Sequence, residues 1–409
     1  MEATKKIKTK LKTTSLCKNK NFLFLWGGSA ISLFGLQIYM IVMPLLIYDL
    51  SQSALAMSGI RVMEILPNVL LGMVAGVIVD RVHRKKIMTI TVLVQWLAIG
   101  GILLLLLSQG IQLWSLFLLG FLFSGSGYFF GNAYHSSLPQ IIAKEQLTEA
   151  NAKLSFMDTM IRMVGPGITG FILAATTFEG TLFIQFICIS ILLIFLTKIR
   201  IPPVERQNTR NSFWMDLKEG IKELFGNKLL LTPTIAILFV NLASSMVIGV
   251  LLFFAVDIIG ATESQIGLML SFGALGGLLG ALAVKKILNY IPRGKLFTYS
   301  LVIEIIGFTI LIFANTWWVI GISLAIRTFA VSIVNIIYLA ARQEFTPNHL
   351  LGRVSGTSSM LMKLAMPVGL LFAGIWAEIL PIRPLFLITV VIVSIIFMGL
   401  LRTRFYQVT

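Results

Sequence analysis

Long apolar runs separated by short polar gaps make up most of the chain. One of these gaps lies in the stretch GVIVDRVHRKK (76–86), which has ILPNVLLGMVA before it and IMTITVLVQWLAIGGILLLLL beginning right after it. A helix needs about 20 apolar residues to cross a bilayer, and the runs are of about that length. They are too continuous for the alternating strands of a membrane barrel. The pattern therefore predicts membrane-spanning α-helices.

We predict twelve such helices, six on each side of one long polar connector. The predicted fold class is an all-α integral membrane protein with about 12 transmembrane helices in two six-helix halves. The predicted spans are 22–48, 54–79, 86–107, 111–134, 150–177, 180–198, 229–256, 264–288, 295–314, 317–341, 355–379 and 383–401.

The connector and the two chain ends set the predicted domain organisation. The connector carries two prolines and mixed charges, and its apolar periodicity predicts a short amphipathic helix around 213–225. The predicted parts are a cytoplasmic basic tail at 1–21, a first six-helix half at 22–198, a cytoplasmic linker at 199–228, a second half at 229–401 and a cytoplasmic tail at 402–409.

The two halves also resemble each other in sequence. A shift of the chain by 204 residues superposes five pairs of identical residues, four of them glycines. Glycines are common in packed membrane helices, but the constant offset at matching helix ends favours a duplication. Duplicated halves with a cytoplasmic linker suit a carrier that holds its substrate between them. The pairs are Gly72 with Gly276, Gly76 with Gly280, Leu147 with Leu351, Gly165 with Gly369, and Gly170 with Gly374.

Composition agrees with a membrane protein. The chain is 57% hydrophobic and 12% charged, whereas globular domains contain about 25% charged residues. The net charge of +16 could suggest a nucleic-acid partner, but most of the 33 lysines and arginines lie in gaps on the side of the N-terminus. This asymmetry predicts a multi-pass protein of the cell membrane with both termini in the cytoplasm and a basic tail that contacts lipid.

Several classes of function have no support in the sequence. The two cysteines, Cys17 and Cys188, provide no disulfide framework and no metal cluster. The phosphate-binding pattern GxxxxGK[ST] of an ATPase is absent, and no constellation of nucleophile and base stands out. We expect no cofactor and no bound metal, a monomer, and no enzymatic activity. A membrane-embedded enzyme is the least favoured alternative.

The basic gap resembles the signature of the major facilitator superfamily, Gly-x-x-x-Asp-Arg-x-Gly-Arg-Lys, with His83 in place of the second glycine. A glycine lets another helix approach closely, and an aspartate can then lie against the positive N-terminal end of that helix. In the family this contact is a cytoplasmic latch, and we expect its partner here to be the eleventh span, which should begin after GRVSG (352–356). The predicted latch residues are Gly76, Asp80, Arg81, Arg84, Lys85, Gly352 and Arg353.

Ionisable residues inside the spans are further candidates, because each costs roughly 2.5–3.5 kcal/mol to insert. Their spacing predicts pairs within one helix at 61/64 and 158/162 and a pair across helices at 304/327. A mutually neutralising structural pair remains the alternative to a coupling role at 61/64. Three other acids, at 49, 257 and 378, are expected at the solvated outer rim. The candidates for proton coupling or the substrate cavity are Arg61, Glu64, Asp158, Arg162, Glu304, Arg327 and Lys363.

Proton coupling needs a carboxylate that gains and loses a proton during transport, and Asp158, Glu64 and Glu304 each have a cationic neighbour. Asp158 is the first candidate. Just after it, Pro166 removes a backbone hydrogen bond, and we expect a helix kink at Gly165, Pro166 and Gly170. The Gly-Pro core is similar to a motif of the family's antiporters.

Two further segments are similar to the branch of the family that contains macrolide-efflux proteins and the enterobactin exporter. The resemblance covers nearly the whole chain, and it implies efflux of an amphipathic compound, either a macrolide or another drug, as in multidrug resistance, or a siderophore. We expect the transport to occur by proton antiport with alternating access. A lipid or lysolipid flippase of the same fold is the alternative. The residues that carry the resemblance are Leu138, Pro139, Ala150, Asn151, Arg162, Gly165, Pro166, Gly352, Arg353 and Val354.

Overall fold

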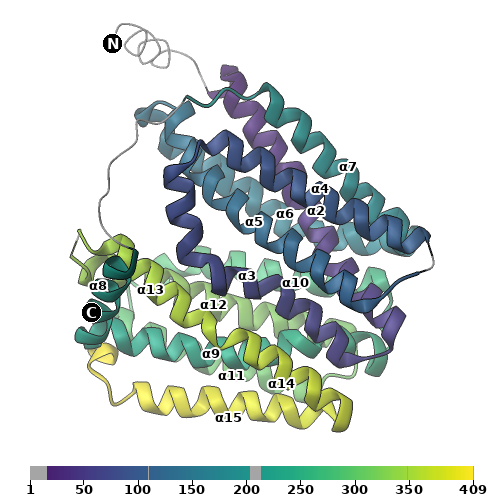
Figure 1. Ribbon diagram of the computed structural model, residues 1–409. Coiled ribbons are helices and arrows are strands. Elements are labelled where there is room, and N and C mark those ends of the chain that lie inside the picture. The colour runs from purple at the N-terminus through teal and green to yellow at the C-terminus, as the bar shows by residue number, and fades with distance from the viewer. Residues whose placement is uncertain (1–15, 109, 203–212, 348, 409) are drawn as a thin grey trace, which may run out of the picture. The chain divides into compact units, whose positions relative to one another are not determined.

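The computed structural model describes residues 16–108, 110–202, 213–347 and 349–408, apart from the side chains of residues 17, 72–77, 80, 81 and 213–217. These parts are almost entirely helical and contain no strand (Figure 1). The helices are α2 (Lys20–Ser51), α3 (Ala54–Arg81), α4 (Arg84–Leu107), α5 (Leu113–Ile141), α6 (Leu147–Ala175), α7 (Phe178–Lys198), α8 (Phe213–Gly226), α9 (Lys228–Phe253), α10 (Glu263–Ile287), α11 (Arg293–Ile312), α12 (Trp317–Phe345), α13 (Leu351–Leu364), α14 (Met366–Ile379) and α15 (Ile382–Leu400).

Each predicted span corresponds to a helix in the structure. Within the described residues, eleven stretches are long and apolar enough to cross a membrane, with α13 and α14 counted as one stretch. The remaining predicted span is α6, which has 29 residues and is therefore long enough. Its four charged residues, Glu149, Lys153, Asp158 and Arg162, lower its hydropathy. The all-α membrane fold is thus confirmed, and α8 matches the predicted linker helix.

Local sequence explains several helix ends. Thr262 and Gln265 form a capping box at the start of α10, and the Asn227 side chain accepts a hydrogen bond from the Leu229 N–H at the start of α9. The α9 helix continues into one π-helical turn, η3 (Phe254–Ile258). These caps satisfy N–H groups that have no partner within the helix.

The eleventh span differs from its predicted form in two ways. The helix α13 begins at Leu351, so that GRVSG lies within its first turns and not before it. Val354 in this segment packs with Leu224 and Leu230, which supplies the apolar contact that holds the early start in place. The span is also interrupted at Ala365, because Pro367 at the start of α14 cannot donate a backbone hydrogen bond.

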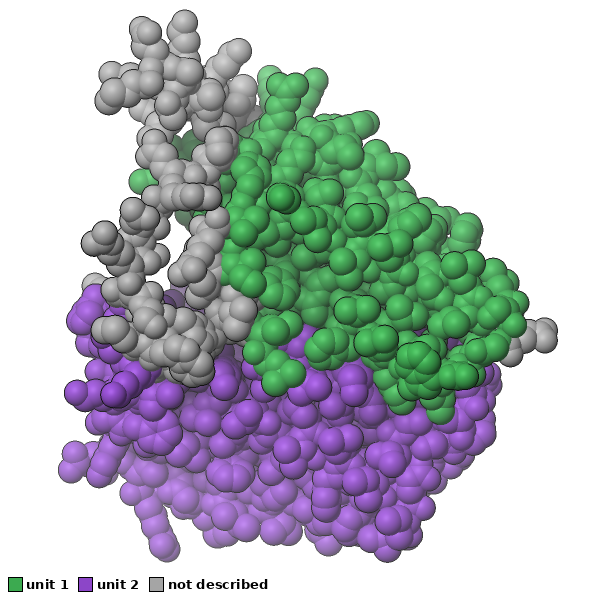
Figure 2. All heavy atoms as spheres, in the orientation of Figure 1, with its two compact units in different colours: residues 1–42, 70–165, 176–208 green, residues 43–69, 166–175, 209–409 purple. Residues whose placement is uncertain are grey.

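Contacts between residues divide the chain into two compact units, shown in Figure 2. Unit 1 comprises residues 1–42, 70–165 and 176–208, and within it α4 packs against α5 and α7. Unit 2 comprises residues 43–69, 166–175 and 209–409. Within unit 2, α12 packs against α10 and α11, and α9 packs against α14 and α15.

The boundary between the units passes inside α2, α3 and α6, and each of these helices has a proline nearby. The boundary falls between residues 42 and 43, 69 and 70, and 165 and 166, and the prolines are Pro44, Pro67 and Pro166. A proline inside a helix removes one backbone hydrogen bond and weakens the helix locally. Two segments from the first half of the sequence, 43–69 and 166–175, therefore pack among helices of the second half.

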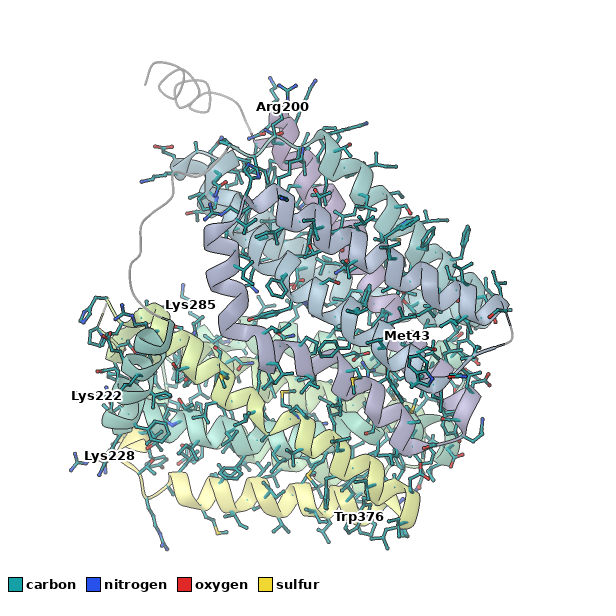
Figure 3. The ribbon with its side chains drawn as sticks, in the orientation of Figure 1. Met43, Arg200, Lys222, Lys228, Lys285 and Trp376 are labelled. Atoms are coloured by element: carbon teal, nitrogen blue, oxygen red, sulfur yellow. The ribbon has the colours of Figure 1, made fainter. Side chains whose placement is uncertain are left out.

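Charged and aromatic side chains mark the two ends of unit 2. Figure 3 shows Lys222, Lys228 and Lys285 at one end of its helices, and Trp376 towards the opposite end. The indole of Trp376 donates a hydrogen bond to the Pro381 carbonyl at 2.9 Å. An excess of lysines is typical of the cytoplasmic surface of a membrane protein, and tryptophan is common at both membrane–water interfaces.

Candidate functional site

The predicted latch in the basic turn is only partly described. Arg84 and Lys85 attach the start of α4 to other helices of unit 1. Lys85 Nζ donates to the Ile199 carbonyl at 2.7 Å. Arg84 Nη1 donates to the side-chain oxygen of Gln140 at 3.0 Å when the Gln140 amide is oriented with its oxygen towards the guanidinium. Gly76, Asp80 and Arg81 lie outside the residues whose side chains the structure describes.

Arg353 joins α13 to the linker helix α8 within unit 2. Its guanidinium forms an ion pair with Glu219 of α8. The two helices approach closely there, because a Cβ on Gly220 would lie 2.8 Å from the Arg353 carbonyl oxygen. A Cβ on Gly352, by contrast, would enter open space. The structure therefore places Arg353 at a contact with the linker.

Asp158 and Arg162 form the predicted pair on α6. Arg162 Nε donates to Asp158 Oδ2 at 2.8 Å, one turn apart on the same helix. Both side chains are accessible within the structure, with 39% exposure for Asp158 and 56% for Arg162. The pair is thus available to solvent or to a ligand.

Arg61 and Glu64 form a more buried pair on α3. Arg61 Nη1 lies 2.9 Å from Glu64 Oε2, and the two side chains are 13% and 6% exposed. The second oxygen of the Glu64 carboxylate, Oε1, has no hydrogen-bond partner among the described residues. This buried carboxylate is therefore poorly solvated, and Arg61 compensates its charge.

Glu304 and Arg327 are the most deeply buried pair of opposite charges. Glu304 of α11 has no exposed surface and Arg327 of α12 has 5%. They interact electrostatically, but no direct hydrogen bond joins them within the described residues. Ser244 of α9 donates to Glu304 Oε1 at 3.0 Å, and the Arg327 guanidinium lies 4.0 Å from the centre of the Phe308 ring.

This arrangement leaves hydrogen-bonding capacity between the two groups. Glu304 Oε2 and Arg327 Nε and Nη1 have no partner among the described residues. Gly307 is needed at the crossing, because a Cβ there would lie 2.4 Å from Arg327 Cγ. Buried polar atoms without a hydrogen-bond partner cost free energy, which makes this pair a candidate for a functional role.

The Gly-Pro segment of α6 makes contacts of two kinds. A Cβ on Gly165 would lie 2.7 Å from Gln37 Cγ of α2, within unit 1. Beyond Pro166, the Gly167 N–H donates to Ser271 Oγ of α10 at 3.0 Å, within unit 2. The helix runs on through Pro166, so the expected kink remains a prediction. Lys363, at the end of α13, is exposed and has no ion-pair partner in the described chain.

Two of the acids expected at the solvated rim make specific contacts. Asp257 accepts a hydrogen bond from the Tyr48 hydroxyl at 2.5 Å. Glu378 accepts hydrogen bonds from Ser53 Oγ and from the Leu55 N–H, the latter at 3.0 Å. Both acids are exposed, as expected, but the sequence interpretation missed their partners. These partners lie 209 and 325 residues away along the chain.

Comparison with known proteins places these helices in a family. The sequence matches the model of the Major Facilitator Superfamily over residues 25–369 and 234–407. The chain belongs to this superfamily. It is therefore a membrane transport protein, and its fold agrees with solved structures of transporters.

Two structures illustrate the superfamily fold. A crystal structure of the nucleoside transporter NupG has a TM-score of 0.72 and 16% identity, and it covers 94% of this chain and 99% of that one. A bacterial homologue of the iron transporter ferroportin has a TM-score of 0.74 and 16% identity, covering 95% and 100%. At such identities the likeness shows the fold alone.

Curated superfamily members are more similar in sequence. Macrolide efflux protein A of Streptococcus pyogenes is 26% identical over 378 residues, which is 90% of this chain and 92% of that protein. Multidrug efflux pump Tap of Mycolicibacterium fortuitum is 26% identical over 359 residues, covering 86% and 87%.

Proposed function

We propose that this transporter exports an amphipathic, drug-like small molecule from the cytoplasm in exchange for protons. The observation that carries the proposal is the similarity to macrolide efflux protein A over nearly the full length of both chains. In the proposed topology both termini lie in the cytoplasm, in agreement with the lysines at one end of unit 2 (Figure 3). A macrolide is the first substrate to test and a catecholate siderophore the second.

Proton coupling is supported by three acids that lie beside cations. Asp158 is the first candidate from its sequence, and its ion pair with Arg162 is not enclosed by other side chains. Glu64 and Glu304 are buried beside arginines, so a proton gained by either carboxylate would leave the neighbouring arginine without its opposite charge. Each proton that enters the cell yields about 2.3 kcal/mol per 100 mV, which can drive export against a gradient.

The cytoplasmic latch is the second part of the proposal. We place Asp80, the last acid of α3, at the N-terminal end of α13 in the outward-facing state, as in the family's signature. The ion pair of Arg353 with Glu219 supports a role for the linker helix α8 in holding the start of α13. A movement of α13 would then also move the linker helix α8.

Accumulation of a fluorescent dye and a labelled macrolide in cells tests this function. Cells that express the protein should retain less of at least one compound than cells without it, and a protonophore should abolish the difference. The three variants Asp158→Asn, Glu64→Gln and Glu304→Gln then locate the coupling residue. Equal retention in both strains for macrolides, dyes and catecholates would contradict the proposal.

A further inference from the structure

Within unit 2, helix ends from the first half of the sequence contact helix ends from the second half in three places. They involve the last turn of α2, the start of α3 and the end of α6 from the first half. Their partners are η3, the start of α10 and the end of α14 from the second half. In the proposed topology all six ends lie on the outer side of the membrane.

The contact between α3 and α14 is a helix cap supplied by another helix. The Glu378 carboxylate of α14 accepts hydrogen bonds from Ser53 Oγ and the Leu55 N–H. The first N–H groups of a helix have no partner within it, and they carry the positive end of its dipole. A carboxylate from a different helix therefore satisfies donors that α3 cannot satisfy by itself.

Close backbone packing lies beneath this cap. A Cβ on Gly374 would lie 2.7 Å from Ser58 Cβ and 3.0 Å from Leu55 Cα. Ser58 is fully buried, and its hydroxyl donates to the Leu370 carbonyl at 2.8 Å. Water and ions cannot reach Ser58 while this contact exists.

The same packing recurs at the position related by the 204-residue repeat. Gly170 of α6 corresponds to Gly374, and a Cβ on it would lie 2.4 Å from the Glu263 carbonyl oxygen of α10. The residue that corresponds to Glu378 is Ala174, which has no carboxylate. The duplicated contact thus has an acidic cap in only one of its two copies.

We propose that Glu378 fastens these contacts at the outer side of the transporter, so that its hydrogen bonds to the start of α3 must break before the outer gate opens. The inference rests on the proton-driven export and the topology proposed above, with the substrate site open to one side of the membrane at a time. Glu378 is exposed, so water can solvate its carboxylate and the α3 N–H groups as soon as they separate. These hydrogen bonds can therefore break without leaving unsatisfied groups, so the contact can open in each transport cycle.

The accessibility of Ser58 tests the gate without any substrate. Ser58→Cys is introduced into a full-length background that carries Cys17→Ser and Cys188→Ser, and intact cells are treated with a membrane-impermeant maleimide. Adding Glu378→Ala should raise the labelling rate about tenfold, because two hydrogen bonds to a carboxylate are lost. Glu378→Gln keeps an acceptor oxygen and should give a smaller increase.

The control is Glu179→Ala, which removes an acid at the start of α7 on the same proposed face. Its labelling rate should equal that of the background. Equal labelling with and without Glu378 would overturn the proposal, and so would labelling of Ser58→Cys confined to inside-out vesicles. Failure to find an exported compound would not affect this readout, so the two proposals fail separately.

A cross-link tests whether the gate must open. Ser53→Cys and Glu378→Cys are joined by a short, cleavable bifunctional thiol reagent, and transport of a compound identified in the accumulation assay is measured. Transport should be lost when the residues are joined and recovered after cleavage, whereas each single variant should be insensitive to the reagent. Full transport in the cross-linked protein would overturn the gate.

Discussion

Glu304 and Arg327 carry opposite charges in the interior of unit 2, where neither is solvated. Removal of one member of a buried pair leaves the other without compensation, at a typical cost of 3–5 kcal/mol, about as large as the effect of a core cavity. Removal of both members costs less. The Ser244 hydroxyl beside Glu304 and the Phe308 ring beside Arg327 cannot replace the missing opposite charge.

We therefore predict that Glu304→Gln and Arg327→Gln each lower the thermal stability of the purified protein more than the double variant does. Unfolding curves in detergent measure this difference. The exposed pair Arg293 and Glu344 is the control, since exposed pairs contribute about 0–1 kcal/mol. If the effects of the two buried substitutions simply add, the two charges do not interact.

Asp80 provides a second test at the level of one residue. Asp80→Asn removes the charge that we place at the N-terminal end of α13, an interaction worth up to about 2 kcal/mol. Transport should fall while the amount of protein in the membrane stays near that of the unaltered chain. Quantitative blotting and the accumulation assay measure the two effects, and unchanged transport would exclude the latch.

Interactions within one helix could be predicted from the sequence. Interactions between helices mostly could not, although the pair at 304/327 was expected and its two members interact electrostatically. The pairs at 61/64 and 158/162 follow from helical periodicity alone and are present in the structure. The contact of Glu378 with α3 joins residues 325 positions apart, and no spacing rule connects them. Such contacts depend on how the helices pack.

Helix positions were predicted well because apolar length determines them. The second span was predicted to begin at residue 54 and the sixth to end at 198, where α3 begins and α7 ends. The fourth was predicted too short, because α5 continues to Ile141 through Pro139, beyond the apolar run. The break before Pro367 was missed because the span 355–379 was taken as one continuous helix, although Pro367 lies within it.

Glycines of α10 allow this helix to pack closely against α12, and the stability of the protein should depend on this packing. A Cβ on Gly276 would lie 2.0 Å from the Ala325 carbonyl oxygen, whereas a Cβ on Gly277 would meet Ser332 Oγ at 3.4 Å. Gly276→Ala should destabilise the protein by about 1–3 kcal/mol because a backbone must move. Gly277→Ala is the matched control and should be near neutral. Equal unfolding temperatures for both variants would contradict this packing.

The topology proposed for the whole molecule rests on its cationic asymmetry. Single cysteines in place of Lys20 and Arg404 should react with an impermeant thiol reagent only in inside-out vesicles, because both termini are proposed to be cytoplasmic. A cysteine in place of Glu179 should react in intact cells. Reaction of Lys20→Cys and Arg404→Cys from opposite sides would require an odd number of crossings.

Transport by the purified protein in liposomes tests the central claim most directly. The protein is reconstituted into liposomes that contain a labelled macrolide, and an inwardly directed proton gradient is imposed. The account predicts release that is faster with the gradient than without it, is abolished by a protonophore, and is lost in the variant that lacks the coupling acid. Release that is absent, or that is equal with and without the gradient, would contradict a proton-driven exporter.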